Sequence, residues 1–117
     1  DLLAHQIYAA SDFILVPSKF EPCGLIQMIA MSYGTVPIAH RTGGLIDSIN
    51  NGYNGFLFKN YTAQALRETV EKAVNIWRYE KKKYKKMVEN ALLTDFSWDK
   101  SAKEYLRLYE DMVRNLH

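Results

Sequence analysis

The sequence is poor in cysteine and proline and has no long apolar run, and these absences exclude whole classes of protein. Its 117 residues include one cysteine, Cys23, and three prolines. A lone cysteine cannot form an internal disulfide, which excludes a disulfide-stapled secreted scaffold. No apolar run approaches the roughly 18 residues of a membrane span, so we expect no segment to cross a bilayer and no membrane partner.

Neither sign of charge dominates the sequence. Fifteen Lys and Arg residues stand against 13 Asp and Glu residues, which gives a formal net charge of +2. On this balance we expect no nucleic-acid partner. Residues 1–5 lack the basic segment that opens a signal peptide, so none is predicted. The composition is 48% hydrophobic and 24% charged, which is typical of a single folded domain with a modest core.

The first half of the chain alternates short apolar runs with helical patterns. Strands are predicted over 13–16, 35–39 and 56–58, and helices over 2–10, 22–32 and 45–50. The run at 13–16 is continuously apolar, which indicates a strand covered on both faces of a parallel sheet. Pro22 suits the first turn of its helix, and Gly34 suits the end of that helix. Pro37 favours the start of its strand or an edge position.

The second half is predicted to be entirely helical. Thr62 is a suitable N-cap for a first helix, and a second helix of about fifteen residues follows it. Ser97 is predicted to cap a third helix, whose apolar stripe we interpret as packing surface. The stripe consists of Trp98, Ala102, Tyr105, Leu106, Tyr109, Met112, Val113 and Leu116.

Strand–loop–helix units in succession predict right-handed βαβ crossovers and a parallel sheet. The predicted fold class is therefore α/β: a partial doubly wound parallel sheet of about three strands with a helical C-terminal cap. A strand as continuously apolar as 13–16 normally has neighbours on both sides. The predicted architecture therefore looks incomplete at this strand, which we expect to present an unpaired edge.

The loop after the first strand is one candidate ligand site, because ligands of open parallel sheets bind at the carboxyl ends of the strands. Glu21 can accept hydrogen bonds from paired sugar hydroxyls. Gly24 lets the backbone approach a ligand, and the N–H groups of the predicted first turn at 22–25 favour an anion or a sugar oxygen. The alternative is a carboxylate that only complements the helix dipole.

The loop at 40–44 is the second candidate. The consecutive glycines Gly43 and Gly44 before a short helix predict a nest of backbone amides that suits a diphosphate. Arg41 adds positive charge and Thr42 adds a hydroxyl. The pattern is neither GxGxxG nor a Walker loop, so the alternative is a plain turn. Because both loops follow parallel strands, we expect them to open on the same rim.

Other residues carry weaker signals. Cys23 has no histidine beside it in the sequence, so a covalent role is not expected. His5, His40 and His117 lack metal-ligand spacing, and neither a metal nor a cofactor is predicted. The stretch 78–86 holds six Lys or Arg residues and one Glu. We interpret it as a solvated helix face, with an anionic partner or a membrane surface as the alternative.

Seven segments of the chain carry a family resemblance. They are HQIYAASD at 5–12, PSKFEPCGL at 17–25, YGTVP at 33–37, RTGGLIDS at 41–48, NGFLF at 54–58, FSW at 96–98 and SAKEY at 101–105. In this order they resemble the C-terminal domain of bacterial glycogen synthases and plant starch synthases. The resemblance covers essentially the whole chain. The pair FEPCGL and RTGGL is specific, whereas the helical segments alone are not.

The resemblance implies a retaining glycosyltransferase of two Rossmann-like domains, with 1–117 as the C-terminal portion of its nucleotide-sugar-binding domain. It implies transfer of glucose from ADP-glucose or UDP-glucose to the non-reducing end of an α-1,4-glucan acceptor. Glu21 is implied as the catalytic-site residue that holds the donor glucose. The implied substrate-binding residues are Cys23, Gly24 and Leu25 around the sugar and Arg41, Thr42, Gly43 and Gly44 at the diphosphate.

The resemblance also implies that parts of the enzyme lie upstream of Asp1. These parts are an N-terminal domain with the acceptor cleft and the family's catalytic arginine and lysine, so the isolated chain is expected to be inactive. Two positions depart from the pattern of related families. Ile26 stands where many members have Thr or Asn, and Ile29 stands where related families have a glutamate that binds the ribose. The implied location is the bacterial cytoplasm or the plant plastid. The alternative function is a non-catalytic module that binds a nucleotide sugar, a glucan or a partner through the lysines of 81–86.

Overall fold

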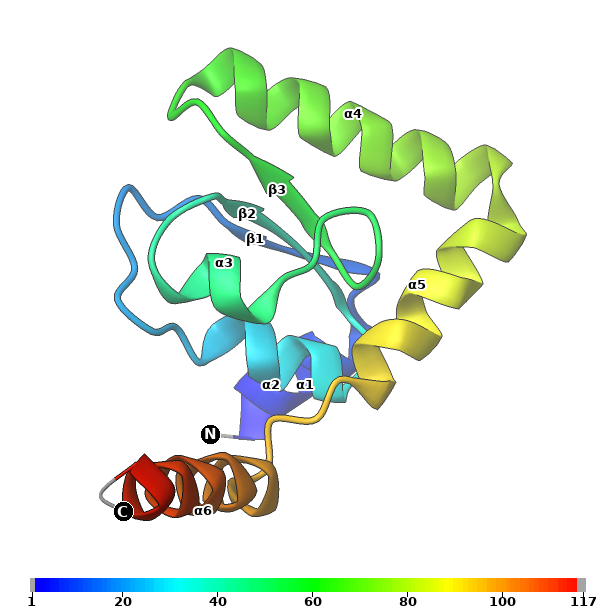
Figure 1. The fold of residues 1–117 in the computed structure, drawn as a ribbon. Coiled ribbons are helices and arrows are strands. Elements are labelled where there is room, and N and C mark those ends of the chain that lie inside the picture. The colour runs from blue at the N-terminus through cyan, green and yellow to red at the C-terminus, as the bar shows by residue number, and fades with distance from the viewer. Residues whose placement is uncertain (1, 116–117) are drawn as a thin grey trace.

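The computed structural model describes residues 2–115, which form a three-stranded sheet flanked by helices (Figure 1). This architecture confirms the predicted α/β class. In chain order the elements are α1 (Leu2–Ala10), β1 (Phe13–Val16), α2 (Ile26–Ser32), β2 (Val36–His40), α3 (Gly44–Ser48), β3 (Phe56–Phe58), α4 (Ala63–Tyr79), α5 (Lys81–Leu93) and α6 (Trp98–Asn115).

The sheet has the order β1-β2-β3, and both strand pairs are parallel, as predicted. Phe13 lies opposite Val36, and Ile38 lies opposite Phe56. Each strand leads through a loop into a helix. In a parallel sheet the carboxyl ends of all strands lie at one edge, so the loops after β1, β2 and β3 leave the sheet on the same side.

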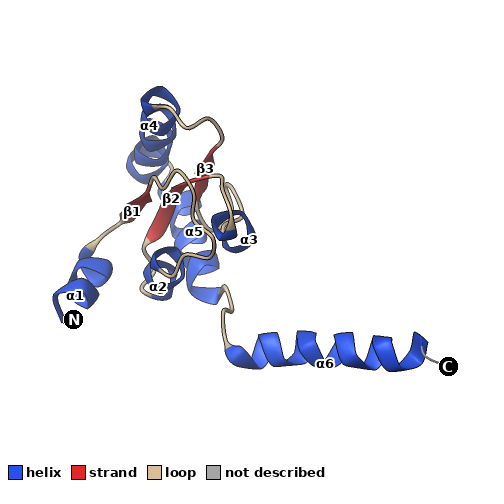
Figure 2. Cartoon of the chain, turned by 90° about the vertical axis from the view of Figure 1, so that its left-hand side faces the viewer, coloured by secondary structure: helices blue, strands red, loops and turns tan. Residues whose placement is uncertain are grey.

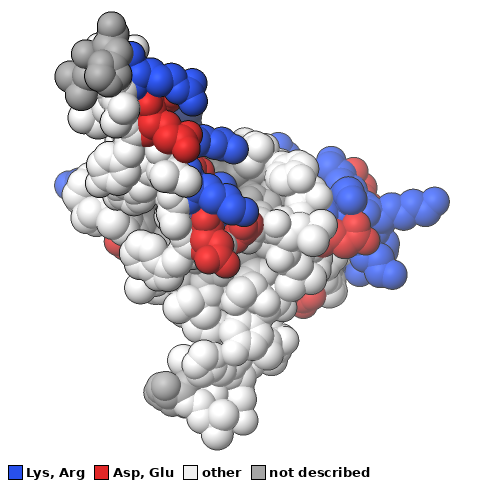
Figure 3. All heavy atoms as spheres, turned by 60° about the horizontal axis from the view of Figure 1, so that its bottom comes forward, with Lys and Arg blue, Asp and Glu red and all other residues white. Residues whose placement is uncertain are grey.

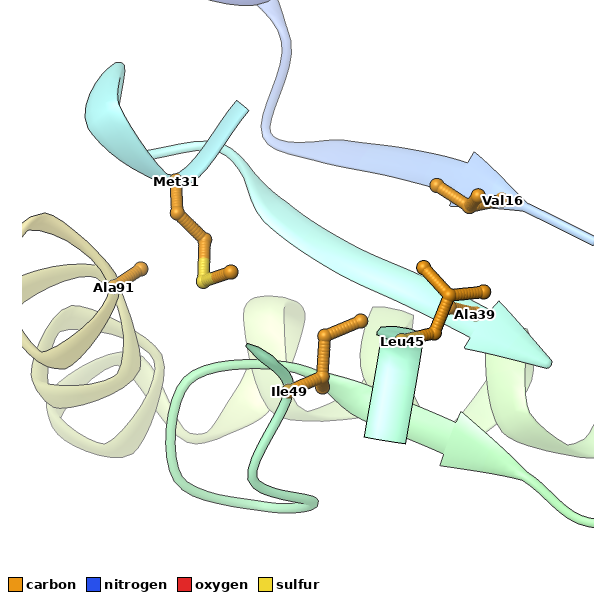
Figure 4. Packing of buried hydrophobic residues seen from close by; sticks show 6 residues of the cluster. All are labelled: Val16, Met31, Ala39, Leu45, Ile49 and Ala91. Carbon is orange, nitrogen blue, oxygen red and sulfur yellow. The ribbon is translucent and has the colours of Figure 1, made fainter. Parts of the chain in front are cut away.

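Alternate side chains of the strands belong to two hydrophobic clusters, one on each face of the sheet. The first cluster contains Val16, Met31, Ala39, Leu45, Ile49 and Ala91 (Figure 4). The second contains Val36, Ile38, Phe56, Ala73, Ile76 and Met87. α5 supplies one residue to each cluster, Ala91 to the first and Met87 to the second. It therefore closes the core at the end of the sheet where the strands begin (Figure 1).

Local capping signals in the sequence are confirmed. The hydroxyl of Thr62 accepts a hydrogen bond from the N–H of Ala65 at 3.1 Å, as an N-cap does. Ser97 accepts one from the N–H of Lys100 at 3.3 Å. The N–H of Gly34 donates to the carbonyl of Met31 at 2.9 Å just after α2 ends.

Pro37 lies in the central strand, so the edge position allowed for it is wrong and the position near the start of a strand is confirmed. The N–H of Val36 donates to the carbonyl of Asp12 before β1, and alternate residues face opposite neighbours. The missing donor of Pro37 therefore faces β3. Pairing with β3 begins only at Ile38, so the proline costs the sheet no ladder bond.

Helix α6 extends away from the sheet (Figure 2) and has no buried residue among those described. Its apolar stripe is exposed; Tyr109, for example, is 61% exposed. Among residues 2–115 no other element covers the stripe, so its interpretation as packing surface stays a prediction. Leu116, the last member of the stripe, lies outside the described residues.

Strand β1 pairs only with β2 among the described residues, and its other edge is open, as predicted. Leu15 in β1 is 51% exposed. An open strand edge with an exposed apolar side chain is a template for pairing with another chain. We therefore expect the 117-residue chain to self-associate through β1.

Leu15→Lys should weaken this association roughly tenfold, because a lysine on an edge strand opposes pairing with a second strand. Sedimentation equilibrium over a range of chain concentrations measures the effect. Leu93→Lys, at a position that is 78% exposed in α5, is the matched control and should leave association unchanged. A chain that is monomeric throughout, or an equal effect of the two substitutions, would contradict the edge-pairing account.

Candidate functional site

The structure brings the two predicted loops into direct contact at the carboxyl ends of β1 and β2. The backbone N–H of Gly44 lies 3.0 Å from the carbonyl oxygen of Glu21 and 3.1 Å from that of Pro22. Figure 1 shows both loops on the same side of the sheet. The prediction that Glu21 and the Gly43–Gly44 pair share one rim is confirmed.

The two glycines are required because the loops pack backbone against backbone. A Cβ atom at Gly43 would lie 2.0 Å from the carbonyl oxygen of Glu21, and one at Gly44 would lie 2.4 Å from that of Cys23. Gly43 also has a φ of +45°, which side chains rarely adopt. The Gly-Gly sequence therefore serves to bring the second loop against the first.

The helix after Glu21 begins later than predicted. We expected Pro22 in its first turn, but α2 begins at Ile26, and residues 22–25 are a loop. Gly24 has a φ of +74°, which a right-handed helix cannot include. Because Glu21 lies five residues before α2, the alternative that its carboxylate complements the helix dipole is wrong.

The first loop presents polar groups that no other described residue satisfies. Glu21 is half-buried, and its carboxylate has no hydrogen bond or ion pair within residues 2–115. The backbone N–H groups of Cys23, Gly24 and Leu25 also have no partner in this range. Cys23 and Leu25 are exposed, so this cluster of one acceptor and three donors is open to a ligand from solvent.

The second loop presents fewer free amides than predicted. The N–H of Thr42 donates to the carbonyl of His40 at 2.9 Å, and that of Gly44 is used in docking the loops. The expectation of free amides at both glycines is therefore wrong for Gly44. In the described part of this turn, the donor groups without a partner are the N–H of Gly43, the hydroxyl of Thr42 and the guanidinium of Arg41.

Two residues that hold these loops, His40 and Gln27, were not predicted as part of the site. His40 is buried, and its Nδ1 lies 2.9 Å from the carbonyl oxygen of Ser18, at the start of the first loop. Its ring packs 5.0 Å from that of Tyr61. Gln27 is fully buried in α2 and donates to backbone carbonyls of the first loop. A polar residue at a helical core position was the only sequence signal for Gln27.

A hollow of about 660 Å³ lies beside the second loop. Arg41, Asp47 and Asn50 are among the residues that line it, and Glu21 is not. Within residues 2–115, no group of three or more His, Cys, Asp or Glu side chains is arranged to hold a metal ion. None of the described helices combines the length and apolar character of a membrane span.

The basic stretch 78–86 lies where α4 meets α5, on the side of the molecule where Lys and Arg gather in Figure 3. Lys83 and Lys86 each pair with a glutamate three residues away, and Lys81 lies 4.1 Å over the ring of Trp77. Burial raises the pKa of Tyr84 in the same helix, and the Asp12 carboxylate raises it further. The local partners of Lys81, Lys83 and Lys86 support the interpretation of the stretch 78–86 as a solvated helix face.

The close packing of the loops predicts different costs for two glycine substitutions. Gly52 has a φ of +81° and open space around it, so Gly52→Ala should cost only the left-handed backbone, about 1–2 kcal/mol. Gly43→Ala adds a backbone clash and should cost about 1–3 kcal/mol more. Urea unfolding of both variants measures the difference. Equal losses of unfolding free energy would show that the loops do not depend on this contact.

The sequence of this chain is similar to those of known glycosyltransferases. Residues 4–94 match the family model described as glycosyl transferases group 1. The chain is 51% identical over 118 residues to the glycogen synthase of Pseudothermotoga lettingae, which covers 96% of the chain and 24% of that protein. The chain therefore spans about a quarter of the length of the curated relatives it matches.

Solved structures share the fold. The catalytic domain of starch synthase IV from Arabidopsis thaliana, bound to ADP and acarbose, has a TM-score of 0.83 and 44% identity and covers 97% of this chain and 25% of that one. Anabaena HepE in complex with UDP-glucose has a TM-score of 0.63 and 26% identity, over 74% of this chain and 23% of that one. The partial Rossmann-like fold is thereby confirmed, and the chain belongs to the group 1 glycosyltransferases, within the glycogen synthase and starch synthase family.

Proposed function

We propose that this chain holds the sugar donor in a glycogen or starch synthase. The reaction is transfer of glucose from ADP-glucose, or from UDP-glucose, to the non-reducing end of an α-1,4-glucan with retention of configuration. The observation that carries the proposal is that the backbone of Glu21, whose carboxylate has no partner among residues 2–115, packs against the Gly43–Gly44 turn at the carboxyl edge of the sheet. The ADP-bound starch synthase and the UDP-glucose-bound HepE support a nucleotide-sugar donor.

In this proposal the first loop holds the glucose. The carboxylate of Glu21 accepts hydrogen bonds from two neighbouring sugar hydroxyls, and a charged acceptor makes such bonds strong. The free N–H groups of Cys23, Gly24 and Leu25 donate to sugar oxygens. The donors and the acceptor lie on one loop. They can therefore hold the hydroxyls of one glucose ring and the oxygen that joins this ring to the diphosphate.

The second loop holds the diphosphate. Negative charge develops there as the bond from glucose to diphosphate breaks, and fixed donors lower the barrier where charge develops. The N–H of Gly43, the hydroxyl of Thr42 and the guanidinium of Arg41 are the free donors in this loop. Gly44 contributes by docking the loop rather than by donating to the ligand.

The other side of the donor comes from a second domain. The two loops form a rim, and the chain spans about a quarter of its curated relatives, so the remaining surface of a closed site lies elsewhere in such an enzyme. The exposed apolar face of α6 is suited to pack against that domain, since large apolar patches mark interaction surfaces. The glucan acceptor would enter between the two.

A hybrid enzyme tests the role of Glu21 directly. In it, this chain replaces the matching quarter of the Pseudothermotoga lettingae glycogen synthase. Glu21→Ala should lower kcat/KM for ADP-glucose at least about 100-fold, equivalent to about 2.7 kcal/mol. Radiolabelled glucose transfer to glycogen is the assay.

Glu104→Ala, at an exposed position in α6, is the matched control and should leave kcat/KM unchanged. The proposal is wrong if Glu21→Ala transfers glucose as fast as the unsubstituted hybrid does.

A further inference from the structure

The side chain of Gln27 connects α2 to the first loop and to α3. It is 0% exposed, and its Nε2 lies 2.8 Å from the carbonyl oxygen of Gly24 and 3.2 Å from that of Cys23. The same Nε2 lies 3.0 Å from the hydroxyl of Ser48. The two hydrogens of this buried amide are therefore shared among three oxygens, two of which belong to consecutive peptide groups of the candidate donor loop.

Ser48 extends this connection to the second loop. Its hydroxyl donates to the carbonyl of Gly44 at 2.9 Å, while it lies within hydrogen-bond distance of Gln27. Gly44 is also the residue whose N–H docks on the carbonyls of Glu21 and Pro22. The two loops are thus joined twice, once by backbone at the rim and once through Gln27 and Ser48 beneath it.

The orientation of the Gln27 amide is fixed by these contacts. Its Oε1 is buried without any partner among the described residues. If Oε1 and Nε2 exchanged places, Oε1 would lie against the carbonyl oxygens of Cys23 and Gly24, and both hydrogen bonds to these carbonyls would be lost. The fold thus leaves an acceptor unpaired, which is unfavourable, in order to hold the two carbonyls. Glycine is favoured at position 24 by its φ of +74°, and a Cβ there would lie 2.6 Å from Oε1.

The peptide group is planar and trans, so its C=O and N–H point in opposite directions. The carbonyl of Cys23 shares a peptide plane with the N–H of Gly24, and the carbonyl of Gly24 shares one with the N–H of Leu25. Because Gln27 draws both carbonyls toward the interior, both N–H groups turn away from it. Gly44 does the same for the N–H of Cys23 by holding the carbonyl of Pro22.

We propose that Gln27 and Ser48 are positioning residues that aim the free N–H groups of the first loop at the donor sugar. Neither residue touches the ligand; each acts through the peptide groups that it holds. This role rests on the proposed function. It also explains why an unpaired buried acceptor is retained in the core beneath the rim.

Two substitutions of Gln27 in the hybrid enzyme test the role. Gln27→Glu keeps the shape but places a carboxylate against two carbonyl oxygens, and only its protonated form can donate a hydrogen bond. Gln27→Met removes the donor without introducing charge. Both should raise KM for ADP-glucose about tenfold at about pH 8, as expected for losing a group that orients binding groups.

On acidification to about pH 6, the Gln27→Glu variant should recover toward the unsubstituted enzyme, because a buried carboxyl protonates readily. Gln27→Met should not recover. The titratable side chains on the first loop and α3 are common to both variants, so any change in their charge cancels in the comparison. They are Lys19, Glu21, Cys23 and Asp47. Gln6→Glu, on the exposed surface of α1, should match the unsubstituted enzyme at both pH values.

The positioning role would be overturned if the KM for ADP-glucose of both Gln27 variants stayed within about twofold of that of the unsubstituted hybrid. The role would also be overturned if the donor KM of Gln27→Glu rose equally at both pH values and the rise followed a lower melting temperature of the variant. A hybrid that transfers no glucose contradicts the proposed function instead. Residual dipolar couplings of the Gly24 and Leu25 N–H groups in the 117-residue chain then decide the positioning role: they should change in Gln27→Met, and unchanged couplings would overturn it.

Discussion

The candidate site depends on one backbone contact, in which the N–H of Gly44 docks on the carbonyls of Glu21 and Pro22. This contact is possible only because neither Gly43 nor Gly44 has a side chain. It sets the separation between an acidic side chain from one loop and the polar groups of the next. Without it, the rims of the two loops would be connected only indirectly, through Gln27 and Ser48 beneath them.

The core beneath the rim keeps this contact in place. Val16 and Ala39, at the ends of β1 and β2, belong to the same hydrophobic cluster as Leu45 of α3. The strand ends and the helix that follows the second loop are therefore packed as one unit (Figure 4). Such support from rigid elements is what a site needs if its donors are to be aimed before the ligand arrives.

Much of the fold could be predicted from the sequence, because local signals there agree with the final packing. Continuous apolar runs gave the strands, and Thr62 and Ser97 marked helix starts that the structure confirms. The shared rim followed from the rule that parallel strands end at one edge. The start of α2 was wrong, because the left-handed backbone of Gly24 outweighed the preference of Pro22 for a first helical turn.

The finer features of the site depend on contacts between distant residues, which no local pattern encodes. Nothing near Gly44 in the sequence shows that its N–H is used by Glu21, or that Gln27 reaches Ser48 across 21 positions. The stripe on α6 has a clear helical period, but a period does not say what covers it. The family resemblance supplied residue roles, and the structure shows which polar groups are free to fill them.

The most direct test of the central claim is an NMR titration of the isotope-labelled 117-residue chain with ADP-glucose. The account predicts that the amide signals of Cys23, Gly24, Leu25 and Gly43 shift together with a single dissociation constant, because both loops hold one ligand. Signals of the basic face at 81–86 should not move. Shifts confined to one loop, or shifts at 81–86 alone, would contradict a donor site shared by the two loops.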